Sequence, residues 1–192
     1  MILVSSCLVG VNCRYDGKNN RNPELLRRLA TGGILPVCPE QLGGLPTPRI
    51  PSEIIGGTAG DLLTAYPFIL EDDDDNIKLN ITGHQTINSF ETDNLTDCSV
   101  QIVNEAGKDI TKYFLRGAHE VARLAMRAGV RYAILKARSP SCGCGQIYNG
   151  TFTNCMINGD GITAALLQRL GIKVYTEEQI TPGILDQMLA DS

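Results

Sequence analysis

Short apolar runs alternate along this chain with segments of helical periodicity. Runs of strand length predict four buried strands, at residues 2–5, 34–37, 130–135 and 172–175. Helical spacing and helix-boundary signals predict four helices, at residues 22–33, 109–129, 160–170 and 182–189. Strands that alternate with helices are typical of an α/β fold in which a mainly parallel sheet is flanked by helices.

Two of these helices have clear boundaries. Asn22-Pro23-Glu24 has the order of an N-cap, a first helical position and an acidic first turn, and the helix that it opens is expected to end near Gly32-Gly33. Apolar residues recur at helical spacing from Phe114 to Ala125, and Gly129 is a plausible left-handed residue at the end of that helix. Because 192 residues are enough for one core and marginal for two, we expect one domain, residues 1–192.

Three segments interrupt the alternation. Residues 38–51 and 137–150 are rich in Gly and Pro and are predicted to be long ordered loops. Residues 56–99 have no clear pattern and are expected to be an insertion that covers part of the domain. Within them, 66–70 and 77–81 are expected to pair as a hairpin, whose acidic turn at Glu71 to Asp75 is interpreted as solvated rather than as a metal site.

Composition and charge exclude several classes of partner. The chain has 17 Lys and Arg against 21 Asp and Glu, a net charge of -4, so it lacks the basic footprint of a protein that binds duplex nucleic acid. With 5% aromatic residues and no Trp, it also offers few surfaces on which bases stack. No apolar stretch reaches the length of a membrane span, and the first residues do not form a signal peptide. We expect a cytoplasmic protein whose oligomeric state the sequence leaves open.

Seven cysteines in a reducing compartment call for an explanation, because disulfides are rare there and the number is odd. Cys7, Cys38 and Cys142 share one context, since each follows a predicted strand and lies in a polar or Gly/Pro-rich loop. Loops that leave the carboxyl ends of parallel strands gather at one edge of the sheet. The three thiols are therefore expected to converge on one metal centre.

The residue types favour an iron–sulfur cluster at that centre. Structural zinc sites usually contain paired cysteines with two residues between them, a pattern that this chain lacks. Two histidines, His84 and His119, are too few for a His-rich zinc site. His119 itself is expected at the surface of a helix or half-buried in it. Isolated thiolates brought together by the fold suit an iron–sulfur cluster. Three thiolates on a four-iron cluster leave one iron open to a substrate, as a Lewis acid.

The other cysteines fall into two groups. Cys144, in the tight Cys142-Gly-Cys144 spacing, and Cys13 are alternative ligands that the sequence leaves open. Cys98 and Cys155 stand next to apolar residues and are expected to be structural.

Acid–base candidates lie beside the thiols. Glu40 comes two residues after Cys38 and is a candidate for acid–base work at the same centre. Ser139 and Ser141 are interpreted as proton donors or substrate contacts, or else as caps of the turn before Gly143. Three charged loop residues are expected either to position a substrate or to hold the loops together: Arg14, Asp16 and Arg49.

A set of motifs, in this order along the chain, carries a resemblance to a known family. The motifs are Cys7-Leu-Val-Gly10, Cys13-Arg-Tyr-Asp-Gly17, Pro36-Val-Cys-Pro-Glu40, Gly43-Gly-Leu-Pro-Thr-Pro-Arg49, Lys136-Ala-Arg-Ser-Pro-Ser-Cys-Gly143, Ile147-Tyr-Asn-Gly-Thr-Phe152 and Gly159-Asp-Gly161. Over residues 1–55 and 100–175 the chain resembles the bacterial family that includes the thiouracil desulfurases.

That resemblance implies a cofactor, a reaction and roles for individual residues. It implies a [4Fe-4S] cluster on Cys7, Cys38 and Cys142, a catalytic Glu40 and a catalytic Ser139. It also implies a non-redox removal of sulfur from a small thiocarbonyl substrate such as thiouracil, with release of hydrosulfide. Family membership does not fix the molecule that enters the site.

Two other functions stay open on the sequence alone. One is an open-iron [4Fe-4S] hydro-lyase that dehydrates a hydroxy acid. Such an enzyme needs several basic side chains to bind the substrate carboxylates, and these loops offer mainly Arg14 and Arg49. The other is a non-catalytic protein that binds a cluster or zinc, in which Glu40 and Ser139 would be replaceable. Metal content and turnover of thiouracil against hydroxy acids separate the three.

Overall fold

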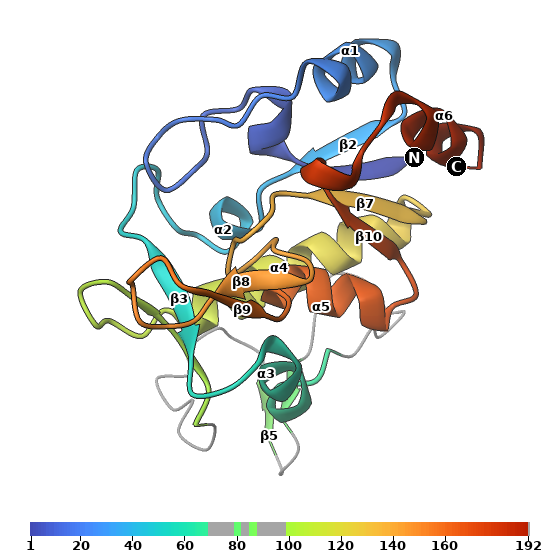
Figure 1. Cartoon of the computed structure of the whole chain (residues 1–192). Helices are drawn as coiled ribbons and strands as arrows, with labels where there is room; N and C mark the ends of the chain where they lie inside the picture. The colour runs from blue at the N-terminus through green and yellow to red at the C-terminus, as the bar shows by residue number, and fades with distance from the viewer. Residues whose placement is uncertain (69–78, 82–84, 88–98, 192) are drawn as a thin grey trace.

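A four-stranded parallel sheet forms the centre of the protein (Figure 1). The computed structural model describes residues 1–68, 79–81, 85–87 and 99–191. The strand order is β10-β7-β1-β2, and the strands span Lys173–Thr176, Tyr132–Leu135, Ile2–Ser5 and Ile34–Val37. The structure thus confirms the α/β class and the four predicted strands, with β7 starting two residues later than expected.

The strands end together at one edge of the sheet. Ser5 is paired with Val37, and Leu135 with Thr176, so the residues that follow β1, β2 and β7 leave from neighbouring points. Because the strands end level with one another, loops that are far apart in the sequence meet at this edge.

Helices cover both faces of this sheet, as Figure 1 shows. Successive residues of a strand point to opposite faces. Ile2 and Val4 pack with Leu25 and Leu185, whereas Leu3 packs against the other helices. One face is therefore covered by α1 (Pro23–Thr31) and α6 (Pro182–Ala190), the other by α4 (Thr111–Arg127) and α5 (Ile162–Arg169).

The predicted helix boundaries are confirmed at α1 and α4. The Asn22 side chain accepts hydrogen bonds from the backbone N–H groups of Glu24 and Leu25, which caps α1. Gly129, with φ of 61°, follows the end of α4 in the left-handed conformation. None of the helices in the described part of the chain combines the length and apolarity that crossing a membrane requires.

A second group of elements packs on the outer side of α4 and α5. The strands β3 (Ser52–Ile55) and β6 (Gln101–Asn104) pair antiparallel, and α3 (Ala59–Ala65) packs against α5. Their apolar side chains share one core with Phe114 of α4. Residues 56–68 of the predicted insertion thus pack outside α4 and α5 and contribute to this core.

The segment after β2 is a short helix where a loop was predicted. Pro39–Leu42 forms α2, which lies against α4. A Cβ at Gly117 of α4 would lie 2.0 Å from the Pro39 carbonyl oxygen, and one at Gly43 would lie 2.0 Å from the Tyr113 carbonyl oxygen. Only glycine at both positions permits this backbone contact, which fixes the place of α2 and of Glu40 within it.

Two further predictions need correction. The segment 137–150 contains β8 (Gln146–Tyr148), which pairs with β9 (Met156–Asn158), because the chain returns antiparallel after the turn. The predicted hairpin is wrong where it can be checked, since β4 (Leu79–Ile81) pairs with β5 (Gln85–Ile87) and Tyr66 ends α3. The acidic run 71–75 lies outside the described residues.

His119 was predicted at or near the surface but is fully buried. It lies on the face of α4 that the second group of elements covers, with its ring 5.0 Å from that of Phe68. Neither ring nitrogen has a hydrogen-bond partner among the residues that the structure describes. Burial lowers the pKa of His119 to about 4, because the charged imidazolium loses its hydration.

Candidate functional site

A cavity of about 360 Å³ opens at the carboxyl ends of β1, β2 and β7. Four cysteine side chains line it: Cys7, Cys13, Cys38 and Cys142. The three cysteines that were predicted to converge, Cys7, Cys38 and Cys142, line this one cavity. The fourth, Cys13, was only an alternative on the sequence.

Each of the three thiols that follow a strand is held by a local backbone feature. Cys7 lies in a 3-10 helix, η1 (Ser6–Val9), directly after β1. Cys38 is the N-cap residue of α2. Cys142 lies in a tight turn in which the Gly143 N–H donates to the Ser139 carbonyl oxygen at 2.8 Å.

Cys13 joins the thiols from a loop rather than from a strand end. It is 2% exposed, and its thiol is close enough to those of Cys38 and Cys7 for both to affect its pKa. Its carbonyl oxygen accepts from Arg49 Nη2 at 2.9 Å, and the Cys38 thiol lies 3.9 Å from the same oxygen. Cys7, Cys13 and Cys38 therefore lie close to one another, and Cys142 is near enough to Cys38 and Glu40 for their charges to raise its pKa.

The surroundings of Cys13, Cys38 and Cys142 keep these three thiols protonated in the absence of a cation. Burial raises the pKa of Cys142 to about 12, partly offset by hydrogen bonds from Ser5 and Ser141. The pKa of Cys13 is raised to about 11: the contact with Cys38 lowers it, but the contact with Cys7 and burial outweigh that. The contact with Cys13, followed by burial, raises the pKa of Cys38 as well. Thiolates here need a metal charge to compensate them, which is the usual chemistry of a cysteine metal site.

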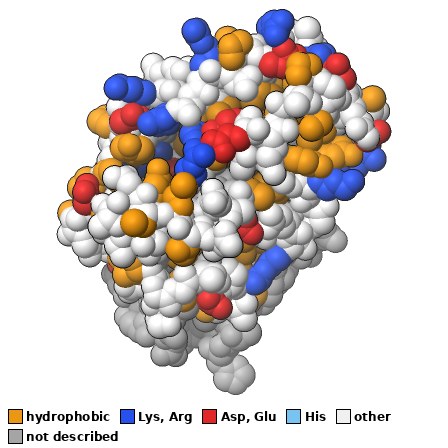
Figure 2. Space-filling model, in the orientation of Figure 1, with side chains coloured by type: hydrophobic (Ala, Val, Ile, Leu, Met, Phe, Trp, Pro, Cys, Tyr) orange, Lys and Arg blue, Asp and Glu red, His pale blue; other side chains and the backbone are white. Residues whose placement is uncertain are grey.

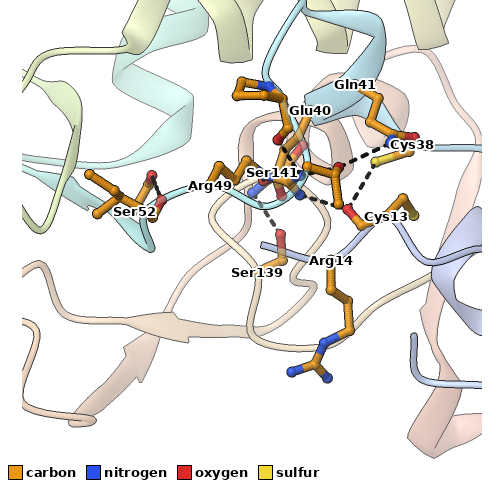
Figure 3. Close-up of polar contacts among 12 residues, drawn as sticks. Cys13, Arg14, Cys38, Glu40, Gln41, Arg49, Ser52, Ser139 and Ser141 are labelled. Atoms are coloured by element: carbon orange, nitrogen blue, oxygen red, sulfur yellow. Dashed lines mark hydrogen bonds and ion pairs between the residues drawn. The ribbon is translucent and has the colours of Figure 1, made fainter. Parts of the chain in front are cut away.

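Glu40 is fixed beside the thiols by an ion pair with Arg49. The Nε of Arg49 lies 2.6 Å from Oε2 of Glu40, and the two side chains are 7% and 17% exposed (Figure 3). Both residues line the cavity. The structure therefore brings together Glu40, Arg49 and the cysteines, as the sequence indicated.

Ser139 also lines the cavity, and its hydroxyl oxygen accepts from the backbone N–H groups of Ser141 and Cys142, each at 3.1 Å. It is a turn cap, one of the two interpretations that the sequence allowed, and its hydroxyl hydrogen remains available for donation. Ser141 is different: it is fully buried, is hydrogen-bonded to Thr163 at 2.9 Å and does not line the cavity. The expectation that Ser141 touches substrate is corrected; it supports Cys142.

Among the remaining charged candidates, Arg14 lines the cavity and Asp16 does not. Asp16 instead pairs with Arg14 at 3.0 Å, so its role is to hold that side chain. Reasoning from the sequence missed two basic residues of the lining, Lys136 and Arg138, which pair with Glu177 and Glu178 at 2.9 and 2.7 Å. Their place directly after β7 was the signal that could have revealed them.

The other cysteines lie elsewhere. Cys144 contacts the Val174 carbonyl oxygen and the Gln168 amide and is absent from the cavity lining, which removes it as a rival ligand in this arrangement. Cys155, expected to be structural, is exposed. Cys98 and His84 lie outside the described residues. Within the described residues, no group of three or more His, Cys, Asp or Glu side chains is arranged to hold a single metal ion.

The cavity wall opposite these loops was not predicted. It comes from the start of β3 and the β8–β9 hairpin and includes Glu53, Tyr148, Phe152 and Asn154. On the face shown in Figure 2, acidic and basic side chains lie next to one another rather than in large patches of a single sign.

Three comparisons with known proteins give matches that cover most or all of this chain. The model of the 2-thiouracil desulfurase family matches residues 2–95 and 76–179. An uncharacterized protein of Bacillus subtilis (strain 168), YbbK, is 36% identical over 180 residues, which is 94% of this chain and 97% of the relative. The solved structure of the [4Fe-4S]-dependent thiouracil desulfidase TudS is 35% identical, with a TM-score of 0.71, over 100% of this chain and 98% of that one. The chain therefore belongs to the 2-thiouracil desulfurase family.

Proposed function

We propose that this protein is a [4Fe-4S]-dependent, non-redox desulfurase that hydrolyses the C=S bond of a small thiocarbonyl compound such as thiouracil. The observation that carries the proposal is the convergence of three strand-end thiols and an oriented carboxylate on one cavity. The resemblance to TudS, which is described as a [4Fe-4S]-dependent thiouracil desulfidase, supports the same cofactor and reaction.

In this proposal Cys7, Cys38 and Cys142 hold the cluster. These three come from separate strand ends, line the cavity together and are buried or half-buried. The raised pKa values of Cys38 and Cys142 mean that these two thiols need a cation in order to ionise. The cofactor, when bound, would supply a Lewis-acidic iron suited to a soft thiocarbonyl sulfur, which would make the attached carbon more electrophilic. Cys13 lies within contact of two of these thiols and is kept as a supporting residue.

Glu40 accepts the proton from the water that attacks the carbon. The Arg49 guanidinium holds one carboxylate oxygen, Oε2, so the side chain is oriented before a substrate arrives. Ser139 keeps its hydroxyl hydrogen free to donate to a ring nitrogen or to relay a proton as the C–S bond breaks. Water supplies the oxygen of the product carbonyl and sulfur leaves as hydrosulfide, so no electron is transferred.

The test is anaerobic reconstitution followed by analysis of metal, acid-labile sulfide and hydrosulfide release. We expect about four iron and four sulfide per chain, and hydrosulfide from thiouracil but no dehydration of hydroxy acids. Stoichiometric zinc without iron after reconstitution, or an iron-loaded protein that releases no hydrosulfide from a panel of thiocarbonyl compounds, would refute the proposal.

A further inference from the structure

The backbone changes direction sharply between β7 and the turn that carries Cys142. Arg138, three residues after the end of β7, has φ of 62°, a left-handed conformation that residues other than glycine adopt infrequently. Strain of this kind persists only where the surrounding structure imposes it. Ser139 follows at once, and its carbonyl oxygen and hydroxyl accept from backbone N–H groups of the turn at 2.8 and 3.1 Å. The contacts that impose this bend therefore decide where Ser139 and Cys142 lie.

Side chains from the two neighbouring strands hold the residues just before the bend. The Lys136 N–H donates to Oγ of Ser5, the last residue of β1, at 3.0 Å. The Ala137 N–H donates to Oε2 of Glu177, the first residue after β10, at 2.7 Å. Because β1 and β10 flank β7, the chain is held from both sides as it leaves the sheet.

The two carboxylate oxygens of Glu177 have separate partners. Oε2 accepts from the Ala137 N–H, while Oε1 lies 2.9 Å from Nζ of Lys136. That ammonium also donates to the Ala137 carbonyl oxygen at 2.9 Å, and Lys136 lines the cavity whereas Glu177 does not. Ala137 is 6% exposed, so without Glu177 its N–H would lose its acceptor while still buried. One carboxylate therefore fixes both the backbone and the ammonium at this point.

The short helix that carries Glu177 is fixed in turn. It is η2 (Glu177–Gln179), and it begins after Thr176, whose N–H and hydroxyl donate to Oε1 of Gln179 at 2.8 and 3.3 Å. Glu178, the next residue, pairs with Arg138 at 2.7 Å, but these side chains are 51% and 35% exposed, against 14% and 19% in the preceding pair. An exposed ion pair contributes little to stability. The two adjacent carboxylates therefore differ in what they hold, and Glu178 serves as a control.

We propose that Glu177 is the positioning residue of the turn 139–142: it holds the backbone ahead of the bend, so that the Ser139 hydroxyl and the Cys142 thiol are brought to the cavity together. Glu177 acts through the Ala137 N–H and the Lys136 ammonium, and it lies outside the motifs on which the family resemblance rests. The inference rests on the proposed function for the chemistry at Ser139, but the position of the turn can be measured on the protein without its cluster.

The test compares four variants with the wild type. Glu177→Ala removes both contacts, whereas Glu177→Gln keeps an oxygen for the Ala137 N–H. Glu178→Gln is the control on the adjacent ion pair. Leu62→Ala, in α3 and outside the cavity lining, is a control for loss of stability alone, because it removes a fully buried side chain from the core.

Three quantities are measured on these proteins. Amide hydrogen exchange of the segment 136–142 is followed by mass spectrometry on the cluster-free protein. The rate at which iron is lost to a chelator is followed on protein reconstituted anaerobically. The kcat and KM for thiouracil are determined on the same reconstituted samples.

We expect exchange in this segment to be faster by about tenfold or more in Glu177→Ala, because the bond to the Ala137 N–H is lost. Iron loss should be faster and kcat lower, each by about 10- to 100-fold, while KM changes much less. Glu177→Gln should return exchange close to the wild-type rate and recover most of the iron retention and of kcat. Glu178→Gln should match the wild type, and Leu62→Ala should unfold at a lower urea concentration yet keep wild-type iron retention and kcat.

Wild-type exchange in Glu177→Ala would overturn the inference, whatever the activity of the protein. So would an equal defect in Glu177→Gln, or the same loss of iron in Leu62→Ala. Faster exchange with wild-type iron retention and kcat would confine Glu177 to local stability and would also overturn its role. A wild type that releases no hydrosulfide would refute the proposed function, whereas exchange and iron retention that depend on Glu177 would still sustain the position assigned to it.

Discussion

The Nε of Arg49 lies 2.6 Å from Oε2 of Glu40, while Nη2 of the same guanidinium lies 2.9 Å from the carbonyl oxygen of Cys13. Nη1 adds hydrogen bonds to the Pro46 carbonyl and the Thr47 hydroxyl. One side chain therefore ties the loop after β1 to α2, as Figure 3 shows. The carboxylate that we assign to proton transfer is thus held by the same group that fixes the backbone beside the thiols.

This relationship makes Glu40→Gln a clean substitution. The Gln amide retains an oxygen for Arg49, so loop structure and iron content should be kept, while the loss of the proton acceptor should lower the rate by about 10²- to 10⁴-fold. Ser139→Ala should also keep the cluster and lose activity. Iron content and desulfurisation rate are measured on the same anaerobic samples. Near-normal rates in both variants would make the acid–base roles untenable.

The cysteine assignment predicts a division among single variants. Cys7→Ala, Cys38→Ala and Cys142→Ala should each abolish cluster assembly, and because a bound cluster contributes to folding they should also lose stability. Cys144→Ala and Cys155→Ala should keep full iron, since neither lines the cavity. Iron analysis and visible absorption after reconstitution check this.

Cys13→Ala decides the role of the fourth thiol. If this variant retains the cluster, Cys13 supports the neighbouring cysteines and is not itself a ligand. Cluster lost in Cys13→Ala but kept in Cys142→Ala would show that the ligand set is wrong.

His119 predicts a pH dependence of stability. Its pKa is about 4 in the folded protein against 6.5 in the unfolded chain, so between these values the unfolded chain binds a proton that the folded protein does not. The free energy of unfolding therefore falls as the pH drops from 6.5 towards 4, by about 3 kcal/mol in total from this residue.

His119→Leu should remove that dependence, and it should stabilise the protein at pH 7 because it replaces two buried nitrogens without partners among the described residues. Urea unfolding of the wild type and this variant at pH 7 and pH 5, at equal iron content, gives the difference. Equal slopes with pH in the two proteins would mean that His119 does not titrate as its burial requires.

The contact between α2 and α4 predicts opposite effects of two glycine substitutions. Gly117→Ala should push α2 away, since its Cβ would lie 2.0 Å from the Pro39 carbonyl oxygen, and should lower both the melting temperature and the iron content through Cys38. Gly183→Ala, in α6, meets no atom within 4 Å and should stabilise by up to about 1 kcal/mol. Thermal unfolding and iron analysis of both variants test this, and a Gly117→Ala protein with wild-type values would contradict the packing.

Much of this protein is determined locally by its sequence. The four apolar runs became the parallel sheet because a buried strand needs only a short continuous stretch of apolar residues. The position of Cys7, Cys38 and Cys142 after those runs was enough to bring their thiols to one cavity, since parallel strands end at a common edge. The cap at Asn22 and the end of α4 at Gly129 followed from the chemistry of single residues.

Other features were decided by contacts between segments far apart in the chain. The Gly/Pro-rich segment after β2 contains α2 because Gly43 meets Gly117 of α4, a backbone contact that no local propensity encodes. His119 is buried because β3, α3 and β6 cover that face of α4. Cys13 joins the other thiols and Cys144 does not, and Glu53 accepts a hydrogen bond from the backbone of Phe152. These arrangements depend on side chains that meet only when the loops converge. Patterns along a chain fix which face of an element is apolar, whereas the partner that each loop side chain meets is fixed only by packing.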